Sequence, residues 1–367
     1  MPRRAVSSQR GRMDLPYLLF TLLLVALGLL MLFSASFARA YYVTGNSASY
    51  FTGQLLFAVL GIVGMWVLSR VPYDWFRSCS RLLYFISVGL LLAVLLFGLT
   101  GGGATRWIRI GFISFQPSEI AKLSLIVSLS KILSEKREEL RSPKTFWACA
   151  VAMGIIAVLL ILEPHFSATI IVAALCFLMM LVGGVNRKYL ITVACIGAAG
   201  LLFLLISGGY TSDRLMAWMD PEAYPTDEGY QIIQSLYAIG SGGLLGLGFG
   251  MGRQKYLYLP EEHNDYIFAI LCEELGFVGA VAILLLFAAL ILRGYWIALH
   301  AKNRFSMLLA TGLTTLLALQ ILLNVGVVTN LLPSTGIAMP FFSSGGTALM
   351  MQLGECGILL NISREID

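Results

Sequence analysis

Ten long runs of apolar residues fill most of the chain, and short polar segments separate them. Each run is close to the about 20 residues that a helix needs to cross about 30 Å of hydrocarbon. The runs begin near Pro16, Phe51, Leu82, Ser118, Phe146, Ser167, Tyr189, Tyr266, Phe305 and Gly345. The pattern predicts an all-α polytopic membrane protein with about ten transmembrane helices.

Composition and charge agree with this prediction. Hydrophobic residues make up 58% of the chain and charged residues only 12%, against about 25% charged in soluble domains. Eighteen of the 25 lysines and arginines fall in segments on the N-terminal side of the predicted bundle, and six fall on the other side. Cytoplasmic segments are rich in Lys and Arg, so both termini are predicted to be cytoplasmic. The basic charge follows topology and gives no reason to expect nucleic acid as a partner.

The predicted organisation is a basic cytoplasmic N-terminus over 1–14 and a single transmembrane domain over 15–364. Three outer connections are long, about 100–117, 208–264 and 332–344. The second lies between predicted helices 7 and 8, and its glycine-rich run over 240–252 either lets backbone approach a ligand or permits tight turns. The third, with its prolines and glycines, predicts a re-entrant loop before helix 10, with a plain surface loop as the alternative.

The first candidate site precedes and begins the fourth predicted helix. Arg106 and Arg109 lie in the outer connection, and Pro117 is typical of a first helical position. Glu119 and Lys122 are three residues apart, so they share a helix face and can pair. The pair either forms a polar wall of an outward-facing cavity or merely allows the helix to insert.

The second candidate site is the segment 256–265, which runs directly into an apolar stretch. Glu261 and His263 precede Asp265 there. Partial desolvation and neighbouring acids would raise the pKa of Asp265 toward a value useful for a general base. The alternative is that Asp265 only caps the helix. A further short turn places Glu163 and His165 at the outer face, with or without a role.

These segments resemble the SEDS family (shape, elongation, division and sporulation), which comprises FtsW, RodA and SpoVE. The resemblance rests on residues 32–36, 106–108, 115–119, 229–231, 234–236, 238–244, 259–265, 268–270, 273–276, 333–337, 340–341 and 360–364. It is strongest toward the FtsW and SpoVE branch. Two segments depart from the family pattern: His165 stands where the family often has Asp, and 342–348 lacks the family tyrosine.

The resemblance implies a peptidoglycan glycosyltransferase that polymerises lipid II by an inverting mechanism at the outer face of the cytoplasmic membrane. It implies Asp265 as the catalytic base. Substrate binding is expected from Arg106, Arg109, Glu119, Lys122, Arg214, Gln231, Lys255, Glu261, His263 and Ser343. A divalent cation, Mg²⁺ or Mn²⁺, would help to neutralise pyrophosphate; the ligands are unknown, and no organic cofactor is expected.

The implied partners are lipid II, an undecaprenyl-pyrophosphate-linked glycan, a class B penicillin-binding protein that acts as transpeptidase, and other divisome or elongasome membrane proteins. A lipid II flippase, or a noncatalytic scaffold of the divisome, is the alternative. The polar residues cluster at the outer face without an inverted repeat, which favours an enzyme over a transporter.

Overall fold

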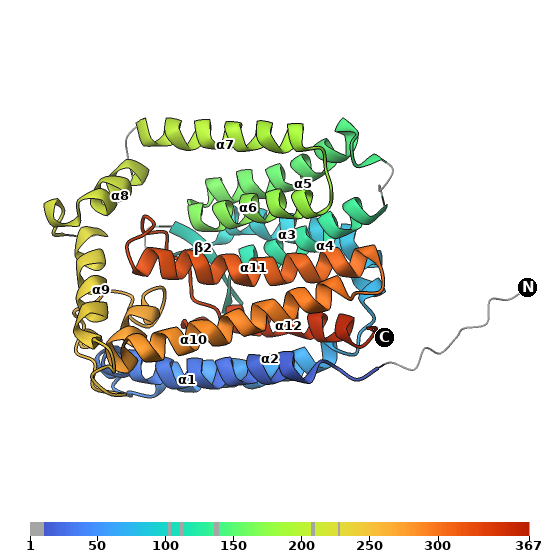
Figure 1. Cartoon of the computed structure of the whole chain (residues 1–367). Coiled ribbons are helices and arrows are strands. Elements are labelled where there is room, and N and C mark those ends of the chain that lie inside the picture. Colours follow the sequence, from blue (N-terminus) through green and yellow to red (C-terminus); the bar gives the residue numbers. More distant parts are fainter. Residues whose placement is uncertain are drawn as a thin grey trace, which may run out of the picture.

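The computed structural model describes residues 11–101, 104–110, 113–135, 139–206, 210–226 and 228–366, and it is built almost entirely of helices (Figure 1). The helices of the described chain are α1 Leu15–Thr44, α2 Ser49–Leu68, α3 Tyr73–Phe97, α4 Pro117–Glu135, α5 Pro143–Leu162, α6 Phe166–Val182, α7 Arg187–Ile206, α8 Tyr210–Met219, α9 Glu228–Gly242, α10 Ile267–Leu299, α11 Arg304–Val328 and α12 Gly346–Ser363. The predicted helical fold class is therefore confirmed.

Several helices begin where their sequence supplies a cap. The side chain of Asp14 accepts a hydrogen bond from the backbone N–H of Tyr17 at the start of α1. Ser142 does the same for Lys144 at the start of α5. Asn303 forms a capping box at the start of α11. Each cap satisfies backbone donors that a helix leaves without partners.

The helices pack side by side as a bundle whose core is α11. This helix contacts α4, α6, α10 and α12, and 72% of its most apolar window is buried inside the protein. By contrast, α2 and α3 bury only 22% of theirs, so their apolar side chains face outward, as lipid-facing helices require. Outward apolar surface of this kind makes the chain a multi-pass membrane protein.

The first and the last described segments of the chain meet at one end of the bundle. The backbone N–H of Gly11 donates to the carbonyl of Arg364 at 2.9 Å, and that of Asp14 donates to Ser363 Oγ at 3.0 Å. Helices α8 and α9 lie at the opposite end (Figure 1). The residues just before α1 and just after α12 thus lie at one end of the bundle, and α8 and α9 of the long connection lie at the other.

A small antiparallel sheet occupies the connection between α3 and α4. Strand β2, Ala104–Ile110, is central, with β1, Leu99–Gly101, and β3, Ile113–Phe115, on its two edges. Trp107 pairs with Leu99 of β1, and Ile108 pairs with Phe115 of β3. The sequence analysis predicted no strand here. The sheet holds β2 beside the end of α3 and the start of α4.

The connection between α7 and α10 is more ordered than a loop. It contains α8, the short 3₁₀ helix η2 Pro221–Ala223, and α9, which packs along α10. The glycine-rich turn after α9 then folds onto α10 where that helix is broken at Gly276, whose φ is 65° and ψ −170°. This segment was predicted as a loop because its short helices carry too few apolar residues to stand out beside the spans.

Each of the ten apolar runs coincides with a helix. Nine of those helices begin within a few residues of the predicted positions, whereas α3 begins at Tyr73, well before the predicted Leu82. By length and hydropathy, six helices among the described residues qualify as spans, namely α1, α2, α3, α5, α10 and α11, and α6 is a shorter apolar helix. The count of ten spans stays a prediction.

Candidate active site

Asp265 lies at the end of a turn that leads directly into α10. It is half-buried and precedes Tyr266, the N-cap residue of α10, so it does not occupy the cap position itself. Its backbone carbonyl accepts a hydrogen bond from Asn324 Nδ2 of α11 at 2.7 Å. A Cβ placed on Gly336 would stand 3.6 Å from Asp265 Oδ2. The carboxylate therefore borders the segment 332–344 at a residue that has no side chain.

The segment 332–344 is irregular and mostly buried among the helices. Asn324 Nδ2 also donates to the carbonyl of Ile337 at 2.7 Å, so one amide ties this segment to Asp265. Ser343 Oγ accepts from the N–H of Met339 and donates to the carbonyl of Asn264 at 2.6 Å. The segment is non-helical backbone packed against the helices, and Ser343 links it to the turn before Asp265. That it re-enters the membrane stays a prediction.

The turn before Asp265 is anchored by a buried carboxylate. Glu262 is fully buried, and its Oε1 is 2.8 Å from Arg39 Nε of α1 and 3.7 Å from His263 Nδ1. Burial acts to raise the pKa of Glu262, but the contacts with His263 and Arg39 outweigh it and hold the pKa below its usual value. Glu261 is exposed and accepts a hydrogen bond from Asn264 Nδ2. Of the two acids, Glu262 fixes the turn and Glu261 faces outward.

The start of α4 carries the predicted ion pair. The helix begins at Pro117, as the sequence predicts. Lys122 Nζ lies 2.8 Å from Glu119 Oε1, and the lysine side chain is only 3% exposed. Glu355 of α12 interacts electrostatically with both partners. The pair is thus one side of a buried charge cluster that joins α4 to α12.

The turn between α5 and α6 lies against β2. Arg106 Nη2 donates to the carbonyl of Pro164 at 2.6 Å. Glu163 and His165 are buried on either side of this proline. Burial raises the pKa of Glu163 to about 8, although the charge of Arg106 opposes the shift. Burial, together with the charges of Arg106 and Lys122, lowers the pKa of His165 to about 3.

The neutral His165 also contacts the segment that precedes α4. Gln116 Nε2 lies 3.3 Å from His165 Nε2, and an amide nitrogen can only donate, so the ring nitrogen is the acceptor. Ser167 Oγ donates to the carbonyl of Thr335 in the segment 332–344. The turn that the sequence left open between a role and none is therefore a buried junction of β2, α4 and the segment beside Asp265.

Three further predicted binding residues lie on two connections, Arg214 and Gln231 between α7 and α10 and Arg109 between α3 and α4. Arg214 of α8 directs Nη1 to the carbonyl of Ser334 at 3.4 Å, so it reaches the segment beside Asp265. Gln231 of α9 donates to the carbonyl of Pro260 at 3.3 Å, which ties α9 to the turn before Asp265. Arg109 is exposed on β2, at the position that pairs with Ser114.

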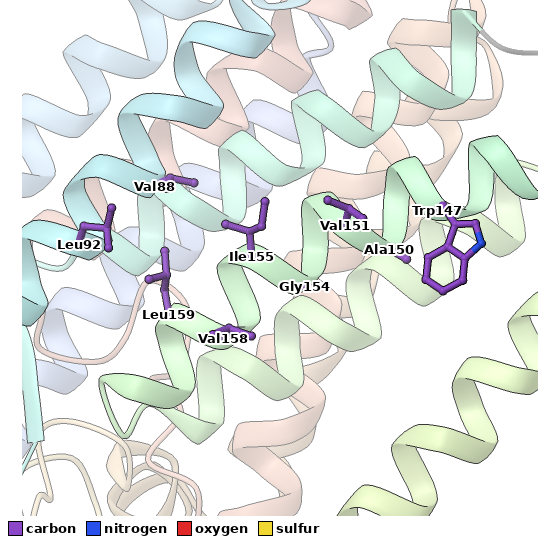
Figure 2. Close-up of a pocket in the computed structure, with 9 residues that line it drawn as sticks. All are labelled: Val88, Leu92, Trp147, Ala150, Val151, Gly154, Ile155, Val158 and Leu159. Carbon is purple, nitrogen blue, oxygen red and sulfur yellow. The ribbon is translucent and has the colours of Figure 1, made fainter.

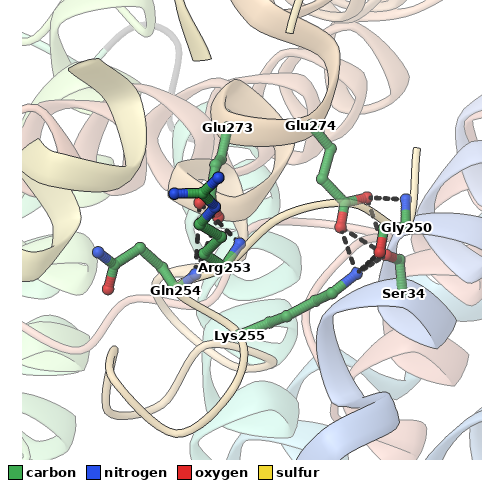
Figure 3. A network of polar contacts seen from close by, with 7 residues as sticks. All are labelled: Ser34, Gly250, Arg253, Gln254, Lys255, Glu273 and Glu274. Carbon is green, nitrogen blue, oxygen red and sulfur yellow. Dashed lines mark hydrogen bonds and ion pairs between the residues drawn. The ribbon is translucent and has the colours of Figure 1, made fainter. Parts of the chain in front are cut away.

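Lys255 differs from its predicted role. Its side chain is 3% exposed, and Nζ contacts Glu274 Oε1 at 2.7 Å, Ser34 Oγ at 3.0 Å and the carbonyl of Gly250 at 2.7 Å (Figure 3). An ammonium group has three N–H donors, and these contacts use all three. The structure therefore gives Lys255 a structural role and leaves it no donor for pyrophosphate.

Glu273 and Glu274 hold the glycine-rich turn to α10. Glu273 Oε1 accepts from the backbone N–H of Arg253 at 2.8 Å, and Glu274 Oε2 accepts from the N–H of Gly250 at 3.0 Å (Figure 3). The sequence left open whether the glycine run lets backbone approach a ligand or permits tight turns. The structure shows tight turns packed on α10.

The protein has two cavities among the described residues that bear on the site. One, of about 580 Å³, is mostly polar and is lined by residues of α1, α2, β2, β3, the turn before Asp265 and α12. The other, of about 590 Å³, is apolar and runs along α3 and α5 from Trp147 to Leu92 and Leu159 (Figure 2). Leu159 lies one helical turn before Glu163, so the apolar groove reaches the C-terminal end of α5.

Sequence reasoning missed Asn324, Arg39 and Ser34. An Asn or Ser inside an apolar run is the available signal, because a buried amide or hydroxyl needs a partner. Among the described residues, no group of three or more His, Cys, Asp or Glu side chains could hold a metal ion, so no step is assigned to a cation here. None of the six cysteines forms a disulfide, and four of them are buried.

Comparison with known proteins identifies relatives over the full length of the chain. A family model described as cell cycle protein, FtsW/RodA/SpoVE, matches residues 15–367. Stage V sporulation protein E of Bacillus subtilis (strain 168) is 40% identical over 362 residues, which cover 98% of this chain and 99% of that protein. A probable peptidoglycan glycosyltransferase FtsW of Trichlorobacter lovleyi is 37% identical over 353 residues, covering 95% of this chain and 93% of the relative.

Solved structures agree in fold. A chain from a structure described as the structural coordination of polymerization and crosslinking by a peptidoglycan synthase complex aligns with a TM-score of 0.82 at 27% identity, covering 97% of this chain and 99% of that chain. Rod shape determining protein RodA of Thermus thermophilus aligns with a TM-score of 0.72 at 25% identity, covering 96% and 97%. The described helices, the buried segment beside Asp265 and these relatives together show that the chain belongs to the FtsW/RodA/SpoVE family.

Proposed function

We propose that this chain is a peptidoglycan glycosyltransferase that polymerises lipid II into glycan strands for cell division or sporulation. Its relatives carry that activity in their names, and they cover nearly the whole chain. The observation that carries the proposal is the setting of Asp265: a half-buried carboxylate, fixed through its backbone by Asn324 and bordered by Gly336. A fixed base with room beside it is what glycosyl transfer needs.

In the proposed reaction, Asp265 accepts the proton of the 4-hydroxyl of the acceptor sugar. That oxygen bonds to the anomeric carbon of the donor, the bond from this carbon to the pyrophosphate oxygen breaks, and undecaprenyl pyrophosphate leaves with inversion. Proton transfer by one positioned group typically contributes about 10²–10⁴-fold to a rate. Cationic groups near the departing pyrophosphate contribute further, because they stabilise the charge that develops there.

We assign substrate-binding roles from where each side chain lies and what it contacts. Arg214 contacts the segment beside Asp265, and Arg106 and Arg109 lie on β2 over the outer ends of the helices. We assign these three to the pyrophosphate or sugar headgroups, with Glu119 and Lys122 as a buried wall. Gln231, His263 and Ser343 order the turn before Asp265, and Glu261 faces outward. A divalent cation on the pyrophosphate remains part of the proposal, with no ligand assigned.

The lipid tails need an apolar route. The groove between α3 and α5 is apolar along its length and reaches the outer end of α5 (Figure 2), which suits an isoprenoid chain whose headgroup lies near β2. The site is proposed to face the outside of the cytoplasmic membrane, with both termini inside. A photoreactive lipid II should crosslink to Leu92 or Leu159, and crosslinks only at the opposite end of the bundle would refute this route.

The test of the function is lipid II polymerisation by the purified protein. Wild type and Asp265→Asn are compared alone and with a cognate class B transpeptidase, in Mg²⁺ and in Mn²⁺. Glu222→Gln is the matched control, because Glu222 is an exposed acid of the same outer connection. Strands from wild type and from the control, lost in Asp265→Asn, support the proposal. Equal products from all three would remove Asp265 from the chemistry.

Lipid II translocation is the second candidate. The buried cluster of Glu119, Lys122 and Glu355 supports it, since ionisable groups inside a helical bundle often line transport routes. Fluorescent lipid II in vesicles separates the two functions: a flippase moves it across the membrane without forming strands, and it tolerates Asp265→Asn. A scaffold without either activity would tolerate neutralisation of the whole cluster.

A further inference from the structure

The mostly polar cavity of about 580 Å³ has no part in the proposed chemistry so far, and its volume falls within the range of small-molecule sites. It lies at the outer end of the bundle, beside β2 and the start of α12. Its lining includes Tyr50, Gln54, Trp107, Glu261 and Asn264. We refer to it as the outer cavity.

The outer cavity is separated from Asp265 by one stretch of backbone. Asn264 lines the cavity, and the next residue, Asp265, does not. The wall is fixed, because Ser343 Oγ donates to the carbonyl of Asn264 and the N–H of Ser344 donates to the carbonyl of His263, at 2.6 and 2.8 Å. A molecule that reaches both Asp265 and the outer cavity must therefore be extended and pass around this turn.

The lining combines aromatic rings with hydrogen-bonding groups. Trp107 and Tyr50 are partly exposed, and the Tyr50 ring is oriented by an edge contact with His263 at 4.7 Å between centroids. Glu261 is exposed and adds carboxylate acceptors at the rim. Sugar rings present C–H faces that pack on aromatic rings and hydroxyls that pair with such acceptors. The apolar groove of Figure 2 offers no comparable set.

The cavity is also built to keep its shape. Both amide atoms of Gln54 are engaged, since Nε2 donates to the carbonyl of Ser343 and Oε1 accepts from the N–H of Gly345. Thr347 Oγ1 donates to the carbonyl of Ser114, which joins the start of α12 to β3. A pocket held by such contacts binds a ligand with little ordering cost.

We propose that the outer cavity binds an N-acetylhexosamine unit of a glycan strand, outside the bond that is being formed, with Trp107 as its stacking platform. The inference rests on the proposed function and adds a subsite to it. A strand held there while its reacting end lies at Asp265 stays on the protein between additions. The cavity would then set how long the strands become, and Trp107 would be a specificity-determining residue.

The test uses the full chain in detergent and a short, lipid-free glycan oligosaccharide as the probe, with a single disaccharide as the second arm. Binding is measured for wild type, Asp265→Asn, Trp107→Leu and Trp107→Phe. Trp75→Leu is the matched control, because Trp75 is an exposed tryptophan at the start of α3 and lines neither cavity. Strand lengths are measured in parallel from lipid II.

We expect wild type, Asp265→Asn and Trp75→Leu to bind the oligosaccharide equally, and more tightly than the single disaccharide. Trp107→Leu should bind roughly tenfold more weakly and release shorter strands, and Trp107→Phe should restore most of both. If wild type does not bind the oligosaccharide, or if Trp107→Leu binds it as wild type does, the subsite is refuted. A polymerising Asp265→Asn would instead refute the proposed base, and the two failures are distinct.

Discussion

Asn324 and Asp265 are joined by a hydrogen bond from the Asn324 side chain to the Asp265 backbone, at 2.7 Å. The same amide nitrogen donates to the carbonyl of Ile337 at 2.7 Å. One side chain of α11 therefore sets the spacing between the turn that carries Asp265 and the segment that it borders. Neither contact involves the carboxylate of Asp265. Asn324 therefore affects the reaction through the position in which it holds Asp265.

The first prediction concerns this contact. Asn324→Leu keeps the volume but leaves two buried carbonyls without their donor, which should cost about 2 kcal/mol of stability. A displaced base should also lower kcat by roughly a hundredfold, with KM for lipid II changed little. Polymerisation kinetics and thermal unfolding measure the two effects separately.

Asn361→Leu provides the control for that prediction. Asn361 is equally buried, and its Nδ2 donates to the carbonyl of Ser69 at the far end of the bundle. Asn361→Leu should lose about 1 kcal/mol of stability, because one carbonyl loses its donor, and keep its kcat. If both variants lose kcat in proportion to stability, Asn324 has no positioning role.

The second prediction concerns Lys255. Lys255→Met leaves Glu274 buried without its cation, and breaking a buried pair costs about 3–5 kcal/mol. The double variant Lys255→Met/Glu274→Leu removes both charges and should recover most of that loss. Thermal unfolding of the two single variants and the double variant completes the cycle. Additive losses would show that the two side chains are not coupled.

The third prediction concerns the break in α10. Gly276 and Gly246 both have positive φ, and a Cβ on either would collide with backbone of the other segment. Gly276→Ala should therefore cost more than about 3 kcal/mol. Gly45→Ala is the control, because Gly45 has a φ of 71° and open space around it, so it should lose only about 1 kcal/mol. If Gly276→Ala and Gly45→Ala lose the same free energy of unfolding, the backbone around Gly276 moves to make room for the Cβ.

The fourth prediction is a pH dependence from Glu163. Its pKa is raised from 4.5 to about 8 by burial, so the folded protein keeps this proton when the unfolded chain has lost it. The contribution of the protonated Glu163 to the free energy of unfolding is complete below pH 4.5, and it is lost as the pH rises toward 8. Glu163→Gln should remove this decline in the unfolding temperature. The groups that face Glu163, namely Arg106 and His165, remain in the variant.

The contribution of His165 to stability is lost in the opposite direction, as the pH falls. Its pKa is lowered toward 3, so its contribution is complete above its ordinary value of 6.5 and is lost as the pH falls. The two ranges overlap between pH 4.5 and pH 6.5, so measurements from pH 6.5 to 8.5 isolate Glu163. Parallel curves for wild type and Glu163→Gln over that range would contradict a buried carboxyl.

The sequence was sufficient for the ten apolar helices, and it missed α8 and α9. Apolar runs located the helices because a span needs an unbroken apolar stretch, and Pro117 marked the start of α4 correctly. The first turns of α3 escaped notice, because polar residues such as Asp74 and Arg77 interrupt the hydrophobicity there. The sheet at β2 was also missed, since its edge strands are only three residues long.

Roles that depend on long-range contacts were beyond the sequence. Lys255 lies in a segment with acids and bases of the outer face, yet its partner Ser34 is more than 200 residues away. The same holds for Arg39 and Glu262, which pair across 223 residues. Local charge can suggest that a lysine is functional, but only the packing decides whether its donors are already taken.

The break in α10 restricts how this helix can move. The N–H groups of Leu247 and Gly248 donate to the carbonyls of Glu273 and Glu274, and the N–H groups of Phe277 and Val278 donate to Gly243 and Leu244. The residues on both sides of the break are therefore hydrogen-bonded to the same glycine-rich turn. The outer piece of α10, which follows directly after Asp265, cannot pivot at Gly276 unless that turn lets go first. The part of α10 before Gly276 is therefore held to α9 through this turn, in place of a free hinge near Asp265.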